Sequence, residues 1–220
     1  MFGTKFEVMD QAVNQQTTEG IWLSINKDKN VFVMDVEGTD SSERNSNGEK
    51  HTYEQSTSTF ALAMSDVFMI NLDCDSIGQY EGCNYDIIEI IFQMNLALFE
   101  QKQLKRLLFV VRDFNKDEQN EEAISTRLQK DLEGLWQKTV CDTEHASKIL
   151  NDFFHVDYVF LAHKLFEEAE FMEGALQLAQ RFKLDTPNSL FLTKDEKENV
   201  PVSAYSKYME QTWQAIRENK

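Results

Sequence analysis

The 220-residue chain has few cysteines and no long apolar run, and both shortages exclude classes of protein. Its three cysteines, Cys74, Cys83 and Cys141, show no C-x-x-C spacing, and their odd number indicates free thiols in a reducing compartment. No apolar segment approaches the roughly 18 residues that a membrane-spanning helix needs. The first residues show no signal-peptide pattern. We therefore expect a soluble, cytoplasmic chain.

Positive charge is also scarce. Lys and Arg number 22 against 38 Asp and Glu, which gives a formal net charge of −16. Such a surface disfavours nucleic acid and anionic lipid as direct partners. By contrast, 41% of the residues are apolar and 16 are Phe, so the chain is not disordered and is long enough for one sizeable core, most simply one domain.

The hydrophobic pattern predicts strands that alternate with helices. A polar link at 27–30 makes the first two strands an antiparallel hairpin. The predicted strands cover 20–26, 31–35, 67–72, 107–111 and 157–161. The predicted helices cover 53–65 and 83–101, the segments with apolar stripes from Ile124 to Trp136 and from Tyr205 to Ile216, and a segment marked by Leu165, Ala169, Met172, Leu176 and Ala179. This order predicts an α/β fold with a mostly parallel sheet flanked by helices.

In sheets of this kind, ligands bind beyond the carboxyl ends of the strands. Residues 35–38, 112–113 and 162–164 all follow predicted strand ends, so we expect them to converge on one rim. The polar loop at 39–52 follows the first of these segments and shows no period of its own.

The stretch Asp35-Val-Glu-Gly38 ends an apolar run, and Thr18 lies in a polar segment upstream. Carboxylate and hydroxyl oxygens suit Mg²⁺, and a glycine amide can approach a γ-phosphate. The alternative is an ordinary strand-ending turn. Glu43 and Arg44 lie in the polar loop, where a solvated charge pair is the alternative to a functional role.

Arg112-Asp113 follows the apolar run at 107–111. A carboxylate there can accept two hydrogen bonds from guanine, and the arginine can lie flat against the base. The alternative is an exposed salt-bridging pair. His163 follows the last predicted strand, and the alternative for it is a loop histidine whose hydrogen bonds are local.

Several segments together resemble the G domain of the root-hair-defective group, dynamin-like GTPases of the endoplasmic reticulum related to atlastins and guanylate-binding proteins. The resemblance runs in order along nearly all of the chain and ends with a segment like the one that ends that G domain. The segments are FGTKFEVMD, QQTTEGIWL, VMDVEGTDSSER, FALAMSDVFMINL, IGQYEGCNYDIIEIIFQMNLALF, LLFVVRD and VPVSAYSKYMEQTWQAIRENK.

The resemblance implies GTP or GDP with Mg²⁺ as cofactors, a homodimer of G domains and a place on the cytosolic face of the endoplasmic reticulum in the intact parent. It assigns catalytic roles to Thr18, Asp35 and Gly38, the first two also as metal ligands. The nucleotide-binding residues would be Arg112, Asp113 and His163, although Ala162 stands where the family usually has proline.

The chain contains no G-x-x-x-x-G-K-[ST], the family's phosphate loop. We therefore expect residues 1–220 to be a partial G domain that lacks the first strand, phosphate loop and first helix and ends in helices leading to an absent stalk. The absent strand would lie between 31–35 and 67–72. Such a chain would bind nucleotide weakly and be inactive alone. The alternatives are a catalytically dead interaction module and an acidic scaffold without a ligand.

Overall fold

The computed structural model describes residues 20–26, 30–37, 49–78, 85–99, 104–184, 186–191 and 201–218. The chain divides into two compact units. One spans Asp66–Glu198, and the other combines Phe2–Ser65 with Asn199–Lys220. Each unit is described by itself below.

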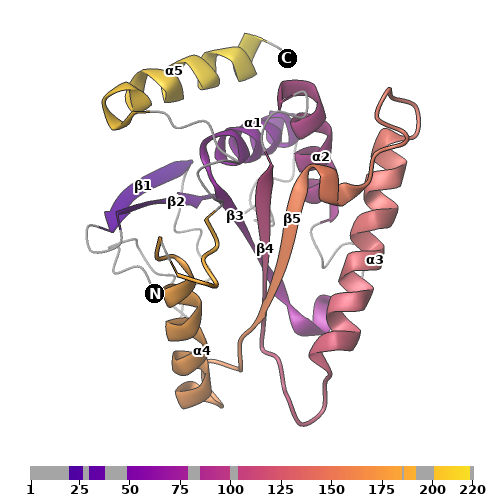
Figure 1. Ribbon diagram of the computed structural model, residues 1–220, viewed down its shortest axis with the longest axis vertical. Coiled ribbons are helices and arrows are strands. Elements are labelled where there is room, and N and C mark those ends of the chain that lie inside the picture. Colours follow the sequence, from indigo (N-terminus) through magenta and orange to yellow (C-terminus); the bar gives the residue numbers. More distant parts are fainter. Residues whose placement is uncertain are drawn as a thin grey trace. The chain divides into compact units, whose positions relative to one another are not determined.

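The first unit contains a parallel three-stranded sheet (Figure 1). Its strands β3 (Val67–Asp73), β4 (Lys105–Arg112) and β5 (Phe154–Phe160) pair in the order β3-β4-β5. The helices are α2 (Tyr85–Phe99), α3 (Glu121–Val140) and α4 (Glu168–Arg181). The predicted α/β fold and each of these elements are therefore confirmed, with ends that differ by a few residues.

Helices cover both faces of this sheet. Phe154 packs against Phe92 of α2, with ring centroids 5.3 Å apart, and Tyr158 donates a hydrogen bond to Gln129 of α3. Asp157 instead pairs with Arg181 of α4. Because successive side chains of a strand point to opposite faces, α4 covers the face opposite to α2 and α3.

Aromatic rings fill the core on the α2–α3 side. Trp136 is fully buried and meets Phe92 edge-on at 5.4 Å. Its indole N–H donates to the Lys148 carbonyl oxygen at 3.0 Å, so the polar edge of a buried ring is satisfied. The strand β4 lies in the middle of the sheet, and five consecutive residues at 107–111 are buried. This core holds the carboxyl ends of β4 and β5 in a fixed register.

The second unit contains an antiparallel hairpin and two helices. The hairpin pairs β1 (Ile21–Asn26) with β2 (Val31–Val36), as predicted. The helices are α1 (Glu49–Met64) and α5 (Val202–Glu218). Among the described residues no ladder joins β2 to β3. The expectation of a further strand between them stays a prediction.

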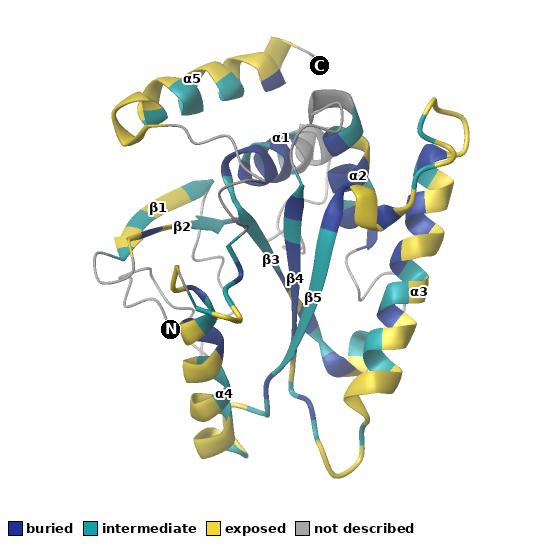
Figure 2. Ribbon diagram, viewed as in Figure 1, coloured by how far each residue is buried: buried dark blue, intermediate teal, exposed yellow. Residues whose placement is uncertain are grey.

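The apolar residues whose spacing predicted α4 do not form its buried face. Ala179 is buried, but Leu165, Met172 and Leu176 are 64%, 60% and 62% exposed, and Ala169 is exposed too (Figure 2). The helix begins at Glu168, so Leu165 precedes it. The ion pair between Arg181 and Asp157, together with burial of Leu178, turns a different side of α4 toward the sheet.

Two further expectations need correction. Asp35 does not lie beyond a strand end, because β2 continues to Val36 and pairs Asp35 with Trp22. The polar loop predicted at 39–52 is shorter, since α1 already begins at Glu49. Residues 39–48 lie outside the described residues.

Candidate nucleotide-base site

The candidate base site begins where β4 ends. Arg112 is the last residue of the strand, and Asp113 follows with φ of +59°. This left-handed conformation is uncommon for a residue with a side chain, although Asp adopts it more readily than most. The turn takes the Asp113 carboxylate out of the strand direction at the rim where ligands bind in such sheets.

Backbone and side-chain contacts hold the segment that follows Asp113. The Phe114 amide donates to the Leu161 carbonyl oxygen at 3.0 Å, and the Phe114 ring lies 5.0 Å from that of Phe160. Further along, Gln119 Oε1 accepts from the Asn115 amide at 2.8 Å. These contacts tie the loop after β4 to the end of β5, so the two strand ends form one rigid rim.

His163 follows β5 and faces Asp113 across this rim. Its Nε2 lies 3.8 Å from Asp113 Oδ1. Its Nδ1 accepts hydrogen bonds from the amides of Leu165 and Phe166, at 3.1 and 3.2 Å. A ring nitrogen that accepts hydrogen bonds carries no proton, so the ring proton is on Nε2, the nitrogen nearer to Asp113.

Phe166 is a site neighbour that the sequence did not reveal. Its ring stacks on His163 with centroids 4.3 Å apart and is 85% exposed. Arg112 is exposed as well. Within the described part of the chain, the basic group within 4 Å of the Asp113 carboxylate is His163 Nε2, and the predicted alternative of an Arg112–Asp113 salt bridge is not found.

Cys74 and Gln119 also lie close to this rim. Cys74 directly follows β3, and its Sγ lies 3.3 Å from Gln119 Oε1. Burial, followed by the charges of Asp75 and Asp73, raises the pKa of the Cys74 thiol. Cys74 is therefore a buried, neutral thiol and not a nucleophile. Of the described cysteines, Cys74 and Cys141 are both free.

The phosphate and metal side of the site is described only at Asp35. Thr18 and Gly38 lie outside the described residues, and so do Glu43 and Arg44. In the part of the chain that the structure describes, no three His, Cys, Asp or Glu side chains gather as a metal cluster. The metal-binding roles of Thr18 and Asp35 stay predictions, as does the convergence of all three loops on one rim.

Glu37, inside the Asp35-x-x-Gly38 stretch, has a structural role that the motif did not suggest. It is buried, with 7% exposure, and its carboxylate accepts from the Gly20 amide at 2.8 Å. The Glu37 amide donates back to the Gly20 carbonyl oxygen at 2.9 Å. Gly20 has φ of +76°, which favours glycine. The pair closes the open end of the hairpin and fixes the residues next to Asp35.

Comparison with known protein families identifies the family of this chain. Residues 1–220 match the family model for the GTPase domain of the root hair defective 3 GTP-binding protein (RHD3). This chain belongs to that family. The resemblance predicted from the quoted segments is therefore confirmed, and the α/β fold is that of an RHD3-type GTPase domain.

Individual relatives agree with the family match. The chain is 37% identical to protein SEY1 of Komagataella phaffii, 38% identical to protein SEY1 of Yarrowia lipolytica and 39% identical to protein SEY1 homolog 2 of Paramecium tetraurelia. Each match covers 100% of this chain but only 29%, 25% and 29% of the respective relative. Among the described residues of this chain, no helix is long and apolar enough to cross a membrane.

Proposed function

We propose that the rim formed by Arg112, Asp113 and His163 binds the guanine base of GTP. The observation that carries this proposal is the geometry of Asp113: a left-handed turn presents its carboxylate, and His163 Nε2 lies 3.8 Å from one of its oxygens. The carboxylate keeps acceptor capacity for two donors on guanine. Adenine offers no matching pair, so Asp113 selects the base.

The donor set of the described residues fits the base more completely than it fits the metal. Asp113 is about one-third exposed, and Arg112 and the Phe166 ring reach solvent beside it, which leaves room for a planar ligand. When bound, GTP with Mg²⁺ supplies the phosphoryl group to be transferred and neutralises its charge. Thr18 and Asp35 would hold the ion, and the Gly38 amide would approach the γ-phosphate.

For the whole protein we propose the activity that the family resemblance implies. It would hydrolyse GTP, dimerise through its G domains and tether membranes of the endoplasmic reticulum, with this chain on the cytosolic face. A second proposal rests on one observation, the absence of G-x-x-x-x-G-K-[ST] from the 220 residues. It states that the chain acts as an inactive interaction module.

The base contacts can be tested on the 220-residue chain itself because they do not require the phosphate side. We expect GDP, but not ADP, to shift the NMR signals of the His163 ring and the Phe114 amide. Loss of the paired hydrogen bonds in Asp113→Ala should weaken GDP binding about tenfold to a hundredfold.

The matched control is Asp117→Ala, which removes an exposed carboxylate from the same loop and should bind GDP as the unchanged chain does. If Asp113→Ala keeps the preference for GDP over ADP, the base assignment is wrong. If neither nucleotide binds at any attainable concentration, the interaction-module proposal gains.

A further inference from the structure

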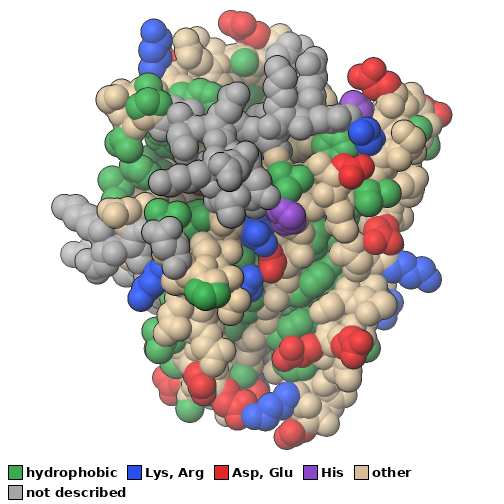
Figure 3. All heavy atoms as spheres, viewed as in Figure 1, with side chains coloured by type: hydrophobic (Ala, Val, Ile, Leu, Met, Phe, Trp, Pro, Cys, Tyr) green, Lys and Arg blue, Asp and Glu red, His purple; other side chains and the backbone are tan. Residues whose placement is uncertain are grey.

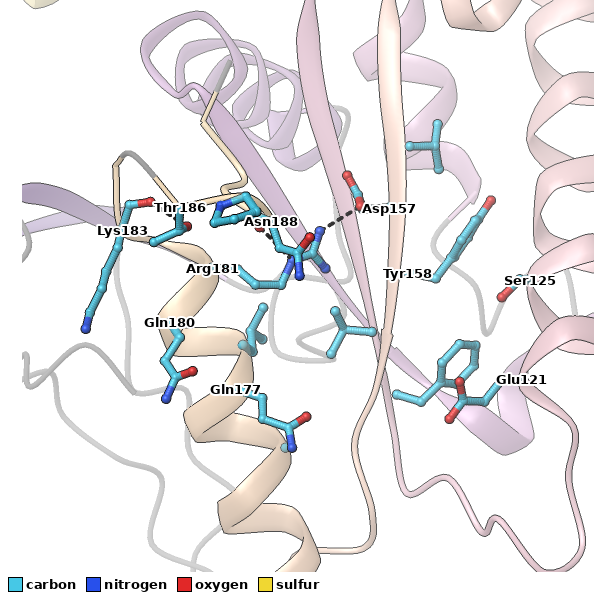
Figure 4. A pocket seen from close by; sticks show the side chains of 16 residues that line it. Glu121, Ser125, Asp157, Tyr158, Gln177, Gln180, Arg181, Lys183, Thr186 and Asn188 are labelled. Carbon is cyan, nitrogen blue, oxygen red and sulfur yellow. Dashed lines mark hydrogen bonds and ion pairs between the residues drawn. The ribbon is translucent and has the colours of Figure 1, made fainter. Parts of the chain in front are cut away.

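A cleft of about 920 Å³ runs along the outer side of β5 in the unit Asp66–Glu198. The strand residues 156–160 form its floor (Figure 4). Glu121 and Ser125 of α3 line one wall, and Gln177 and Arg181 of α4 line the other. The volume lies within the range of ligand-binding clefts, but the lining is largely polar.

Within the described ranges, the floor of this cleft is a strand edge that pairs with no other strand. Leu161 N–H donates to the Val111 carbonyl oxygen, and the Phe153 carbonyl oxygen accepts from Lys105 N–H. Odd-numbered residues of β5 therefore direct their backbone groups at β4, because these groups alternate between the two sides of a strand. The peptide groups of Val156, Tyr158 and Phe160 face the cleft. Among the described residues no further strand pairs with β5.

One end of the cleft is positive. Asp157 accepts a hydrogen bond from Arg181 at 2.8 Å and another from Arg106, while Lys183 lies nearby on the lining. Burial alone would raise the pKa of Asp157, but the hydrogen bonds from Arg181 and Arg106 outweigh it and lower that pKa. Arg106 and Arg181 thus bind one ionised carboxylate, and Lys183 adds a further positive charge to the lining.

The opposite end is negative. The helix α3 runs antiparallel to β5, since Trp136 packs on Phe154 whereas Gln129 binds Tyr158. Glu121, at the start of α3, therefore lies toward the Phe160 end. Figure 4 shows Arg181 beside Asp157, and Glu121 lower along β5 on the α3 side. Acidic side chains also gather where α3 and α4 begin, at the foot of Figure 3.

We propose that this cleft binds an extended peptide segment of a partner protein, which adds a strand to β5. The exposed peptide groups supply hydrogen bonds at a two-residue repeat, as in other cases of strand addition. A basic residue of the partner lies at the Glu121 end and an acidic residue lies at the Arg181–Lys183 end. In antiparallel pairing, the more stable arrangement, the basic residue is the N-terminal one.

The helices α3 and α4, which form the walls of the cleft, favour a peptide over a second copy of this chain as the partner. Because α3 and α4 flank the edge of β5, a single extended chain fits between them, whereas the edge of a second sheet would bring its own helices against theirs. Peptide binding at the edge of β5 does not depend on nucleotide binding at the Asp113 rim. The peptide proposal and the guanine proposal can therefore fail independently of each other.

The probe is the fluorescein-labelled heptapeptide Lys-Thr-Val-Thr-Val-Thr-Glu, titrated into the chain by fluorescence anisotropy. Methylation of alternate backbone nitrogens gives two further probes. The peptide methylated on the nitrogens that face β5 should bind about tenfold more weakly, and the other should bind like the parent. Amide exchange should slow at Val156, Tyr158 and Phe160 when the peptide binds.

On the protein side, Lys183→Glu should weaken peptide binding about tenfold. The control Lys130→Glu makes the same charge change on an exposed residue outside the cleft and should have no effect. Thermal melts check that both variants fold.

The proposal is overturned if the labelled peptide does not bind, or if both methylated peptides bind as tightly as the parent peptide. It is also overturned if Lys183→Glu and Lys130→Glu bind the peptide with the same affinity. Protection on the exposed Met172 and Leu176 of α4 would also overturn it. If amide exchange at the β5 edge slows as the protein concentration rises, with no peptide present, the cleft binds a second copy of the chain and the proposal is also overturned.

Discussion

The Tyr205 hydroxyl donates a hydrogen bond to the Met64 carbonyl oxygen, 3.1 Å away and 141 residues earlier in the sequence. Met64 is the last residue of α1, where carbonyl groups lack partners within the helix. The Tyr205 ring also stacks on Phe32 of β2 at 5.5 Å. One residue of α5 thus joins the hairpin and α1 into a unit.

The first prediction concerns this contact. Tyr205→Phe keeps the stacked ring but leaves the Met64 carbonyl without its donor, so the free energy of unfolding should fall by about 1 kcal/mol. Urea denaturation followed by circular dichroism measures the change. Tyr208→Phe removes a hydroxyl from the same helix and should have a smaller effect. Equal losses in the two variants would argue against the role of the hydrogen bond.

A second prediction concerns Asp157 and pH. Its pKa is lowered in the folded chain, whereas the pKa of an Asp in an unfolded chain is about 3.9. The stabilisation from this charge is therefore complete above about pH 4 and is lost as the pH falls through the folded pKa. Asp157→Asn leaves Arg106 and Arg181 without their counter-charge and should cost about 3 kcal/mol at pH 7.

Urea unfolding of the unchanged chain and of Asp157→Asn, at pH 7 and at several values below 4, provides the measurement. The difference in unfolding free energy should shrink toward the acid side. Asp142→Asn, an exposed carboxylate, is the control and should change little at any pH. A difference that stays constant with pH would show that Asp157 does not act through its charge.

The third prediction is that the 220 residues do not release phosphate from GTP above background. They contain no G-x-x-x-x-G-K-[ST]. They therefore offer no such amide cradle or lysine for the phosphates, and phosphoryl transfer depends on that positioning. A phosphate-release assay tests this. Turnover typical of GTPases that disappears in Asp35→Ala would contradict the prediction.

The fourth prediction concerns the segment that follows Gly38, whose residues 39–48 lie outside the described part. In a protein with a complete phosphate side, a transition-state mimic of GTP should slow hydrogen exchange there, because Gly38 and the metal would order it. Glu43 and Arg44 would then be candidates for the contact between two G domains. Unchanged exchange in the nucleotide-bound dimer would leave Asp35-x-x-Gly38 as an ordinary turn.

Local pattern was enough to predict most of the elements, and the resemblance of whole segments, in order, predicted the family. The apolar runs that became β3 and β4 are bounded by polar residues, and the link before Val31 contains turn residues, so short-range preferences decide them. Arg112-Asp113 was recognisable because it directly follows such a run. The family match over 1–220 confirms the inference drawn from the ordered segments.

Contacts between distant segments decided the rest. The stripe from Leu165 to Leu176 has the period of a buried helix face, yet it is exposed because the Arg181–Asp157 ion pair and the burial of Leu178 set the rotation of α4. Helical periodicity states which residues share a face but not which face meets the sheet.

The proximity of Asp113 and His163 likewise could not be predicted without the tertiary structure. The sequence placed each residue after a strand, but the proton on Nε2 and its approach to Asp113 follow from hydrogen bonds to the turn at 165–166. The chain by itself determined its strands, its charge and its family. Tertiary packing decided which charges are paired and which edge of the described sheet has no partner strand, because both depend on groups that meet only when distant segments fold together.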